Sequence, residues 1–149
     1  MNYKGKVTLN APRDRVWETV LDVDQFAACM PGVEDLVLVD DRTFTGAMKA
    51  NVGPIHGDFR FTAKIVESAP PSDLTAEVEG IDSLTKSTMT ATIHMSLAPA
   101  SSATATQLDY QASVSIKGRL GIIGDMVLRP AGAQVINEFF KRLRARVEV

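Results

Sequence analysis

Few side chains in this chain have the type and spacing that catalysis or metal binding requires. The two histidines, His56 and His94, are far apart and have no partner at metal-ligand spacing. Cys29 has neither a second cysteine nor a nearby histidine with which to form a redox or nucleophilic pair. We therefore predict no catalytic residue and no metal site, with the histidines on the surface and the cysteine in a structural position.

Three glycines, Gly118, Gly121 and Gly124, form a loose glycine-rich stretch of the kind that can bind phosphate. Their spacing is not Gly-x-Gly-x-x-Gly, and no lysine follows them at the position that would contact a phosphate. A nucleotide site is therefore not predicted.

Length and composition fit one ordinary globular domain. The chain has 149 residues, 45% hydrophobic and 23% charged, and a domain of this size buries roughly 70% of its unfolded surface. The net charge of -2 argues against general binding to nucleic acid. A single cysteine, no leader sequence and no apolar run near the roughly 20 residues of a membrane span predict a cytoplasmic protein with one domain over residues 1–149.

Five stretches in the middle of the chain alternate between an uncharged face and a polar face. They cover residues 44–52, 55–65, 74–80, 89–97 and 108–116. Since successive strand side chains point to opposite faces, the alternation predicts an antiparallel sheet with one dry side and one wet side. A general acid, base or metal ligand serving a pocket against the dry side would have to lie on that side, and the alternation places none there.

Helices and two further strands flank this central sheet. A first strand is predicted over residues 3–9, followed by two short helices, one opening at Pro12 and one capped by Asp24. Another strand spans residues 36–39, and turns are expected at 52–54, 70–73, 81–82 and 98–102. From residue 119 the apolar period becomes helical, which predicts a long terminal helix with a kink or break between Gly124 and Pro130.

Small side chains are frequent on the dry face. Eight of its 25 positions are glycine or alanine: Gly46, Ala50, Gly57, Ala63, Ala76, Gly80, Ala91 and Ala112. Such residues either leave a cavity between sheet and helix or let the helix approach closely and fill the interior. We favour the cavity, because a solid core would normally use larger side chains.

The cavity interpretation predicts a lining of aromatic, methionine and aliphatic side chains. The predicted ligand-binding residues are Phe26, Met30, Phe44, Met48, Phe59, Phe61, Val78, Met89, Ile93, Met95, Tyr110, Val114, Ile123, Met126 and Val127. Methionine supplies an adaptable, polarisable wall, although it is also a common core residue. Tyr110 is the clearest inward polar candidate, and its hydroxyl either orients a ligand carbonyl or lies in water at the rim of the sheet.

Several local motifs resemble those of a known family. They are Ala11-Pro12 with Val16-Trp17, the stretch Phe-Ala-Ala-Cys-Met-Pro-Gly-Val at residues 26–33, Val52-Gly53-Pro54-Ile55 with Gly57 and Phe59, and Phe139-Phe140. The order of elements resembles the START-like, or helix-grip, superfamily of polyketide cyclases and lipid-transport proteins. Within it, the motifs look like the family of the carbon monoxide dehydrogenase G subunit. The resemblance implies an α+β fold in which a curved antiparallel sheet of about seven strands, with two short helices after the first strand, wraps around a long C-terminal helix.

The same resemblance implies a role beside a molybdenum hydroxylase of the carbon monoxide dehydrogenase type, which such proteins help to place at the cytoplasmic membrane. An apolar cavity in that setting leads us to expect a hydrophobic ligand, either a lipid or a non-covalent quinone with its isoprenoid tail, and no covalently bound cofactor. Lys141, Arg142, Arg144 and Arg146 are predicted to serve the negative end of the helix dipole, and the alternative is peripheral membrane contact through the same four residues.

Three functions remain open at this point. The first is a non-catalytic carrier of a hydrophobic molecule, which we predict because the dry face lacks reactive groups. The second is a START-like enzyme, a cyclase or hydrolase acting on an apolar substrate, which would need His94, Asp109 or Glu79 to point inward through a bulge. The third is a chaperone-like interaction module with a solid interior.

Overall fold

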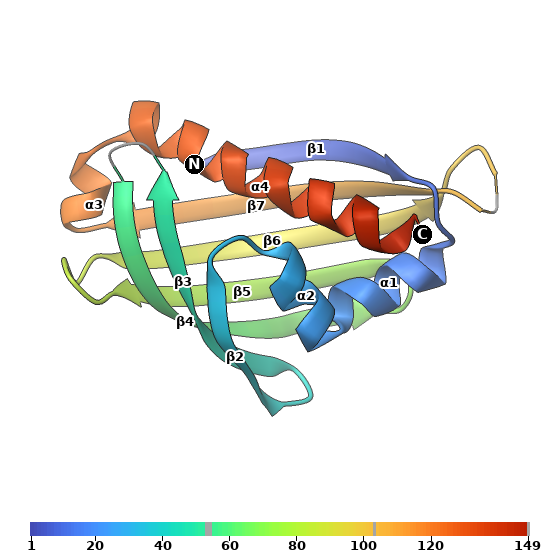
Figure 1. Ribbon diagram of the computed structural model, residues 1–149, viewed down its shortest axis with the longest axis horizontal. Coiled ribbons are helices and arrows are strands. Elements are labelled where there is room, and N and C mark those ends of the chain that lie inside the picture. Colours follow the sequence, from blue (N-terminus) through green and yellow to red (C-terminus); the bar gives the residue numbers. More distant parts are fainter. Residues whose placement is uncertain (53–54, 103, 149) are drawn as a thin grey trace.

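One antiparallel sheet of seven strands forms the body of the described chain (Figure 1). A computed structural model describes residues 1–52, 55–102 and 104–148, so residues 53 and 54 of the predicted 52–54 turn lie outside the described residues. The strands are β1 (Asn2–Leu9), β2 (Val33–Asp40), β3 (Thr43–Val52), β4 (Ile55–Ala69), β5 (Asp73–Asp82), β6 (Thr88–Pro99) and β7 (Thr106–Lys117). Their order is β1-β7-β6-β5-β4-β3-β2, and every neighbouring pair is antiparallel. The predicted sheet is confirmed.

Helices cover one side of this sheet. Those in the described part of the chain are α1 (Arg13–Leu21), α2 (Val23–Cys29), α3 (Arg119–Ile122) and α4 (Asp125–Val147). In Figure 1, α4 runs along the face of the sheet on which α1 and α2 also lie, and it contacts α1, α2 and β1. The arrangement is the predicted α+β helix-grip fold, with two short helices after the first strand and a long helix at the end.

The most completely buried side chains gather at one end of the molecule. There α1 and the last turns of α4 meet the end of β1, the end of β6 and the start of β7 (Figure 1). The buried residues of this core are Leu9, Ala11, Val16, Trp17, Cys29, Met95, Leu97, Leu108, Leu143 and Val147. Full burial of an aliphatic side chain of this size contributes roughly 1.5–3 kcal/mol, so this end anchors the long helix to the sheet.

The second helix is capped two positions earlier than the sequence suggested. Asp22, and not Asp24, is the N-cap of α2, because its carboxylate accepts a hydrogen bond from the N–H of Gln25 at 3.0 Å. Both aspartates are suitable caps by residue type alone. Asp22 is the cap because its backbone is extended. It is at once the C-cap of α1 and the N-cap of α2.

The Met30-Pro31-Gly32 stretch turns the chain from α2 into β2. Gly32 has φ +80°, and its carbonyl accepts a hydrogen bond of 2.9 Å from the N–H of Lys49 on β3. A Cβ at this position would clash with the backbone oxygen of Lys49. Glycine is therefore required here by both conformation and space.

Strand β5 continues through Asp82, beyond the turn expected at residues 81–82. Asp82 is fully buried and shares the inward side of β5 with Val78 and Gly80. Its carboxylate accepts hydrogen bonds from the N–H of Asp58 at 2.8 Å, the N–H of Thr85 at 2.8 Å and the hydroxyl of Thr85 at 2.6 Å. Burial alone would raise the pKa of this carboxyl, but the hydrogen bonds outweigh burial and lower its pKa.

The break predicted in the terminal helix is confirmed at the boundary between α3 and α4. Helix α3 ends at Ile122, and Gly124, with φ +89°, is the N-cap of α4. Pro130 lies inside α4, near its start. Positive φ values of this kind favour glycine, so the change of direction is located at Gly124.

Replacing Gly32 by alanine will destabilise the fold more than replacing Gly124. Both substitutions place a Cβ on backbone with positive φ, which costs roughly 1–3 kcal/mol. Only Gly32→Ala also clashes with backbone, since nothing lies within 4 Å of a Cβ at Gly124. In urea unfolding, we expect Gly32→Ala to lower the free energy of unfolding by about 1–3 kcal/mol more than Gly124→Ala does. Equal losses in the two variants would contradict this account of the turn.

Stability will fall at acidic pH partly through Asp82. Because the pKa of Asp82 is lower in the folded protein than in the unfolded chain, its contribution is complete above the unfolded value of about 3.9 and is lost as the pH falls through the folded value. Asp82→Ala should cost about 1–3 kcal/mol at neutral pH and flatten the acid limb of a plot of unfolding free energy against pH. The exposed Asp41→Ala is the control, and an unchanged acid limb in Asp82→Ala would refute the assignment.

Candidate functional site

The inner face of the sheet contains a central band that is rich in small side chains. Strand register places the inward residues of this band in three rows, which are Ala112-Ile93-Ala76-Ile65, Val114-Ala91-Val78-Ala63-Phe44 and Ile116-Met89-Gly80-Phe61-Gly46. Six of the eight glycines and alanines of the inner face fall within these rows. Small residues are thus concentrated under the middle of the fold rather than spread over the face.

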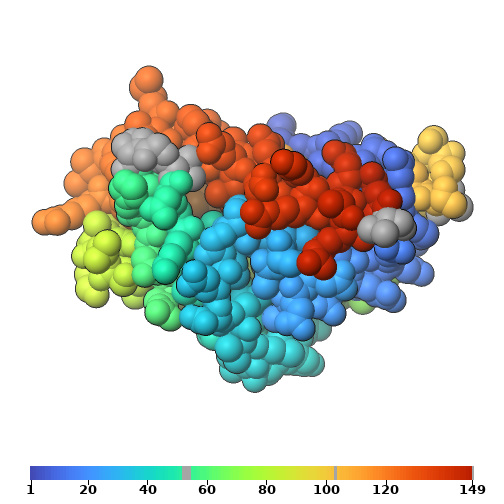
Figure 2. All heavy atoms as spheres, viewed as in Figure 1, coloured from blue at the N-terminus to red at the C-terminus, as the bar shows by residue number. Residues whose placement is uncertain are grey.

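Ile93 shows that the part of this band over β6 is not filled. It lies in the middle of β6, has strands on both sides, and faces the side that the helices cover, yet it is 39% exposed. Met95 and Leu97, which follow on the same face, are only 7% and 3% exposed. A close-packed interior would bury an isoleucine at such a position. The space above Ile93 is therefore open, and Figure 2 shows the surface hollowed between α4, α2 and β3.

A continuous row of aromatic rings borders this open band on the side of the core. Phe44 contacts Phe26 (ring centroids 6.2 Å apart), Phe26 contacts Phe139 (5.8 Å), Phe139 contacts Phe140 (5.2 Å), and Phe140 contacts Tyr110 (5.0 Å). The row crosses from β3 through α2 and α4 to β7. Offset and edge-to-face contacts of this kind are favourable by about 0.5–1.5 kcal/mol each, so the row forms a rigid wall.

Buried side chains close the opposite end of the band. Ile55 and Phe59 at the start of β4, Leu120 of α3 and Leu128 of α4 are all nearly inaccessible to solvent. The open band therefore lies between the filled core at one end and this smaller apolar closure at the other. Its walls are apolar, as is typical of sites for hydrophobic molecules.

The residues predicted to line a cavity differ in their burial. Half-buried members are Phe26, Met30, Phe44, Met48, Phe61, Val78, Met89, Tyr110, Val114 and Val127. Met95 instead belongs to the filled core, and Phe59 to the apolar closure. Met126 lies outside the space altogether, at 92% exposure, and Ile123 is 39% exposed. The break after α3 turns the Met126 side chain outward.

Two residues beside the band were not among the predicted lining residues. Phe140 contributes to the aromatic wall, although its position on the terminal helix is adjacent to the predicted apolar stripe. Asp82 is an inward carboxylate that the sequence placed in a turn. Its oxygens accept the three hydrogen bonds described above, so it fastens the β5–β6 turn to β4.

The hydroxyl of Tyr110 is directed toward the edge strand β1. A Cβ at Gly5, the β1 partner of Tyr110, would lie 2.7 Å from the Tyr110 Oη. The ring packs on Phe140, so its position is fixed from both sides. Two interpretations of this hydroxyl were open, a role in orienting a ligand carbonyl and a position at the rim of the sheet. The geometry favours the position at the rim.

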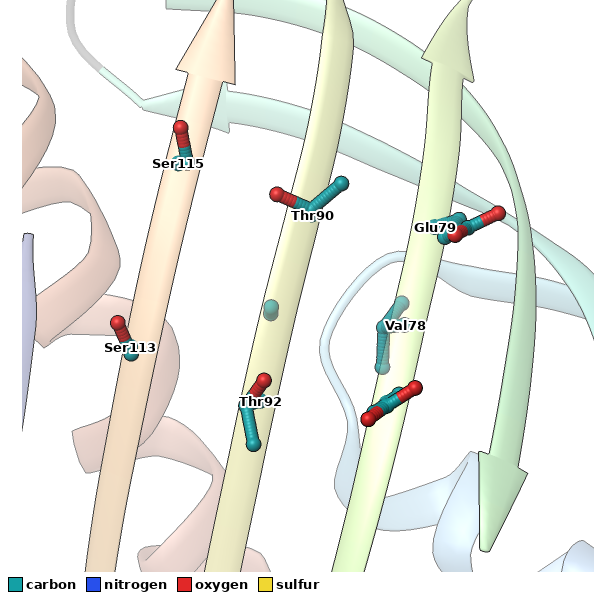
Figure 3. A pocket seen from close by; sticks show the side chains of 8 residues that line it. Val78, Glu79, Thr90, Thr92, Ser113 and Ser115 are labelled. Atoms are coloured by element: carbon teal, nitrogen blue, oxygen red, sulfur yellow. The ribbon is translucent and has the colours of Figure 1, made fainter. Parts of the chain in front are cut away.

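The groups that an enzyme of this fold would need lie on the outer face. His94 contacts Thr75 (Nδ1 to Oγ1, 3.0 Å) and Ser96 (Nε2 to Oγ, 3.1 Å), and Asp109 contacts Gln107. Glu79 is outward as well. Figure 3 shows it beside Thr90, Thr92, Ser113 and Ser115, which line a shallow polar depression on this face. No bulge turns His94, Asp109 or Glu79 inward.

Half of the basic cluster at the end of α4 is paired with carboxylates. Arg142 forms an ion pair of 2.9 Å with Glu138, and Arg144 forms one of 3.6 Å with Glu148. Arg144 also donates to the carbonyl of Thr8 at 3.2 Å. Arg142 and Arg144 thus have structural roles at the helix end, while Lys141 and Arg146 are exposed.

Solved structures share this architecture over almost the whole chain. A conserved protein from Geobacillus kaustophilus has a TM-score of 0.91 at 21% identity, covering 99% of this chain and 95% of that one. A START superfamily protein from Mycobacterium smegmatis has a TM-score of 0.75 at 13% identity (99% and 97%), and the Zhui aromatase/cyclase from Streptomyces sp. R1128 has 0.74 at 14% (99% and 93%). The fold of this chain is therefore START-like.

The sequence itself identifies the family within that class. Residues 5–148 match the family of the carbon monoxide dehydrogenase G subunit (CoxG), and the chain belongs to this family. Comparison with curated proteins gives no match. Among the residues that the structure describes, no helix has both the length and the hydrophobicity needed to cross a bilayer, and no three potential ligand side chains are grouped around a possible metal position.

Two alanines on the inner face distinguish an open interior from a filled one. Ala91 faces the open band, whereas Ala63 is only 4% exposed. We expect Ala63→Leu to overpack its surroundings and cost about 1–3 kcal/mol in thermal or urea unfolding, and Ala91→Leu to cost nothing measurable. Equal destabilisation by both substitutions would mean that the interior is solid.

Proposed function

We propose that the protein is a non-catalytic carrier that holds a hydrophobic molecule in the open band between the sheet and α4. The observation that carries the proposal is the exposure of Ile93 at the centre of an otherwise apolar, helix-covered face. An uncovered apolar surface at the centre of a fold is unfavourable in water by roughly 25 cal/mol per Å². A bound hydrophobic molecule removes that cost.

A quinone with an isoprenoid tail fits the chemistry of the band better than a fatty acid. On the described part of the inner face, Asp82 is the single carboxylate, and no lysine, arginine or histidine lies there to pair with a ligand anion. An ionised fatty-acid headgroup buried without a partner would be strongly disfavoured. Quinone carbonyls are neutral and need at most a hydrogen-bond donor, and the tail would contact Met48, Met89 and Phe61.

The family membership supports a partner for this carrier. A molybdenum hydroxylase of the carbon monoxide dehydrogenase type is the proposed partner, since the family takes its description from a subunit of that enzyme. The carrier would then serve at the inner face of the cytoplasmic membrane, where such quinones are dissolved. Exchange of a lipid-phase molecule between a membrane and an enzyme is a task for which an open, reversible apolar site is suited.

The enzymatic alternative has less support. The Zhui aromatase/cyclase shows that this fold can accommodate an enzyme, but fold similarity does not assign an activity. A cyclase or hydrolase acting in the band would need a free acid, base or nucleophile there. His94, Glu79 and Asp109 are outward, and Asp82 is saturated with hydrogen bonds.

The proposal is tested by filling the band from a single position. Ile93→Trp would occupy the space above β6, whereas Thr92→Trp places the same ring on the outer face one residue earlier. Titration calorimetry with a short-chain quinone should show binding to the parent protein and to Thr92→Trp, and at least about tenfold weaker binding to Ile93→Trp. Neither substitution alters a group placed in the filled core.

Two results would overturn the proposal. One is the absence of both a co-purifying lipid or quinone in native mass spectrometry and any binding of added quinone. The other is binding that Ile93→Trp leaves unchanged while Thr92→Trp weakens it, because the ligand would then lie on the outer face. If a fatty acid binds more tightly than the quinone, the carrier function stands but the proposed ligand is wrong.

A further inference from the structure

Three large apolar side chains project from the end of the molecule opposite the filled core. Ile122 at the end of α3 is 84% exposed, Met126 in the first turn of α4 is 92% exposed, and Leu84 in the β5–β6 turn is 78% exposed. The N–H of Leu120 in α3 donates to the Ser87 hydroxyl at 3.0 Å, which holds the two segments together. We call Leu84, Ile122 and Met126 the apolar tip.

The tip is a built feature rather than an unpacked end. Leu120 and Leu128, which flank Ile122 and Met126 along the chain, are both buried and anchor α3 and the start of α4. Gly124 changes the chain direction between them and thereby turns Ile122 and Met126 outward. Figure 1 shows α3 and the first turns of α4 at this end of the sheet, beside the β5–β6 turn. Side chains exposed to this degree have no role in holding the fold together.

The charges around the tip are mainly positive. Lys86 in the β5–β6 turn, Lys117 at the end of β7 and Arg119 at the start of α3 are exposed and adjacent to it in the chain. Asp125 is the exposed carboxylate of the same segments. Apolar side chains surrounded by cations are the combination that binds anionic lipid surfaces.

A second exposed apolar patch in the same protein has the opposite surroundings. Val37, Leu38 and Val39 of the edge strand β2 are each more than half exposed. Glu34, Asp35, Asp40 and Asp41 flank it and outnumber the nearby cations Arg42, Lys49 and Lys64, of which Lys49 is paired with Glu34 at 3.7 Å. The balance of charge beside this patch is therefore weakly negative, whereas cations are in the majority beside the apolar tip.

We propose that the apolar tip, with Lys86, Lys117 and Arg119, is the surface that contacts an anionic lipid bilayer. A bilayer is the proposed occupant because the three strongly exposed apolar side chains lie on segments whose exposed cations outnumber their exposed carboxylate. The basic cluster at the end of α4 is a weaker candidate, since half of it is paired and its apolar neighbours Leu143 and Val147 are buried. This inference rests on the proposed function in one respect, which is the identity of the molecule exchanged at the membrane.

Insertion can be measured with an environment-sensitive fluorophore at the tip. Met126→Cys and, as the matched control, Leu38→Cys are labelled with a nitrobenzoxadiazole probe and mixed with phosphatidylcholine vesicles with or without phosphatidylglycerol. The native Cys29 interferes little, because burial raises the pKa of its thiol and shields it from the reagent. We expect a blue shift and gain of emission for the Met126 probe with anionic vesicles, and no change for the Leu38 probe.

A second pair of variants tests whether the tip causes the binding. In vesicle flotation with ligand-free protein, Ile122→Ser/Met126→Ser should reduce the bound fraction about tenfold, whereas Val37→Ser/Leu38→Ser should bind like the parent. No flotation of the parent protein, equal flotation of the two double variants, or equal binding to neutral vesicles would overturn the inference. So would a tip that binds only the partner enzyme and no vesicle. Because no quinone is present, failure here leaves the carrier proposal standing, and the Ile93→Trp titration tests that separately.

Discussion

The area of the sheet's inner face is the constraint on which the rest of the structure depends. Seven strands present more apolar surface than the one long helix and three short helices of the described chain cover. Close packing is achieved where α1 and the end of α4 meet β1, β6 and β7, and the side chains of Leu120, Leu128, Ile55 and Phe59 are also buried at the opposite end. Between these two ends the small residues Ala76, Ala91 and Ala112 leave a space that no helix fills.

The local motifs that resemble the family's serve mainly to fix the boundaries of this space. Gly32 permits the turn from α2 into β2. With this turn in place, the ring of Phe26 in α2 packs against the ring of Phe44 in β3. Phe139 and Phe140 extend the aromatic wall from α2 to β7. Outside these motifs, Asp82 holds the β5–β6 turn against β4 at the other end, and backbone and hydroxyl donors stabilise its charge. Such motifs define a shape without specifying any reaction.

Alternation of side chains was sufficient to predict the sheet and its two faces, because a period of two is a local property of the chain. The predictions that failed depend on non-local contacts. Asp22 and Asp24 are equivalent caps until the end of α1 is known, and the inward position of Asp82 depends on donors from β4. Likewise Met126 was placed near the interior by its type, whereas the turn at Gly124 directs it outward. Whether the interior is open depends on the packing of α4, which no local pattern encodes.

Methyl NMR of the isoleucines tests the central claim most directly, since Ile93 lies in the open band and Ile81 is exposed on the outer face of the neighbouring strand. Titration with a short-chain quinone is predicted to shift the Ile93 methyl resonance and to leave that of Ile81 unchanged. An Ile93 resonance that stays fixed while the quinone binds, or while Ile81 shifts, would contradict an internal hydrophobic site.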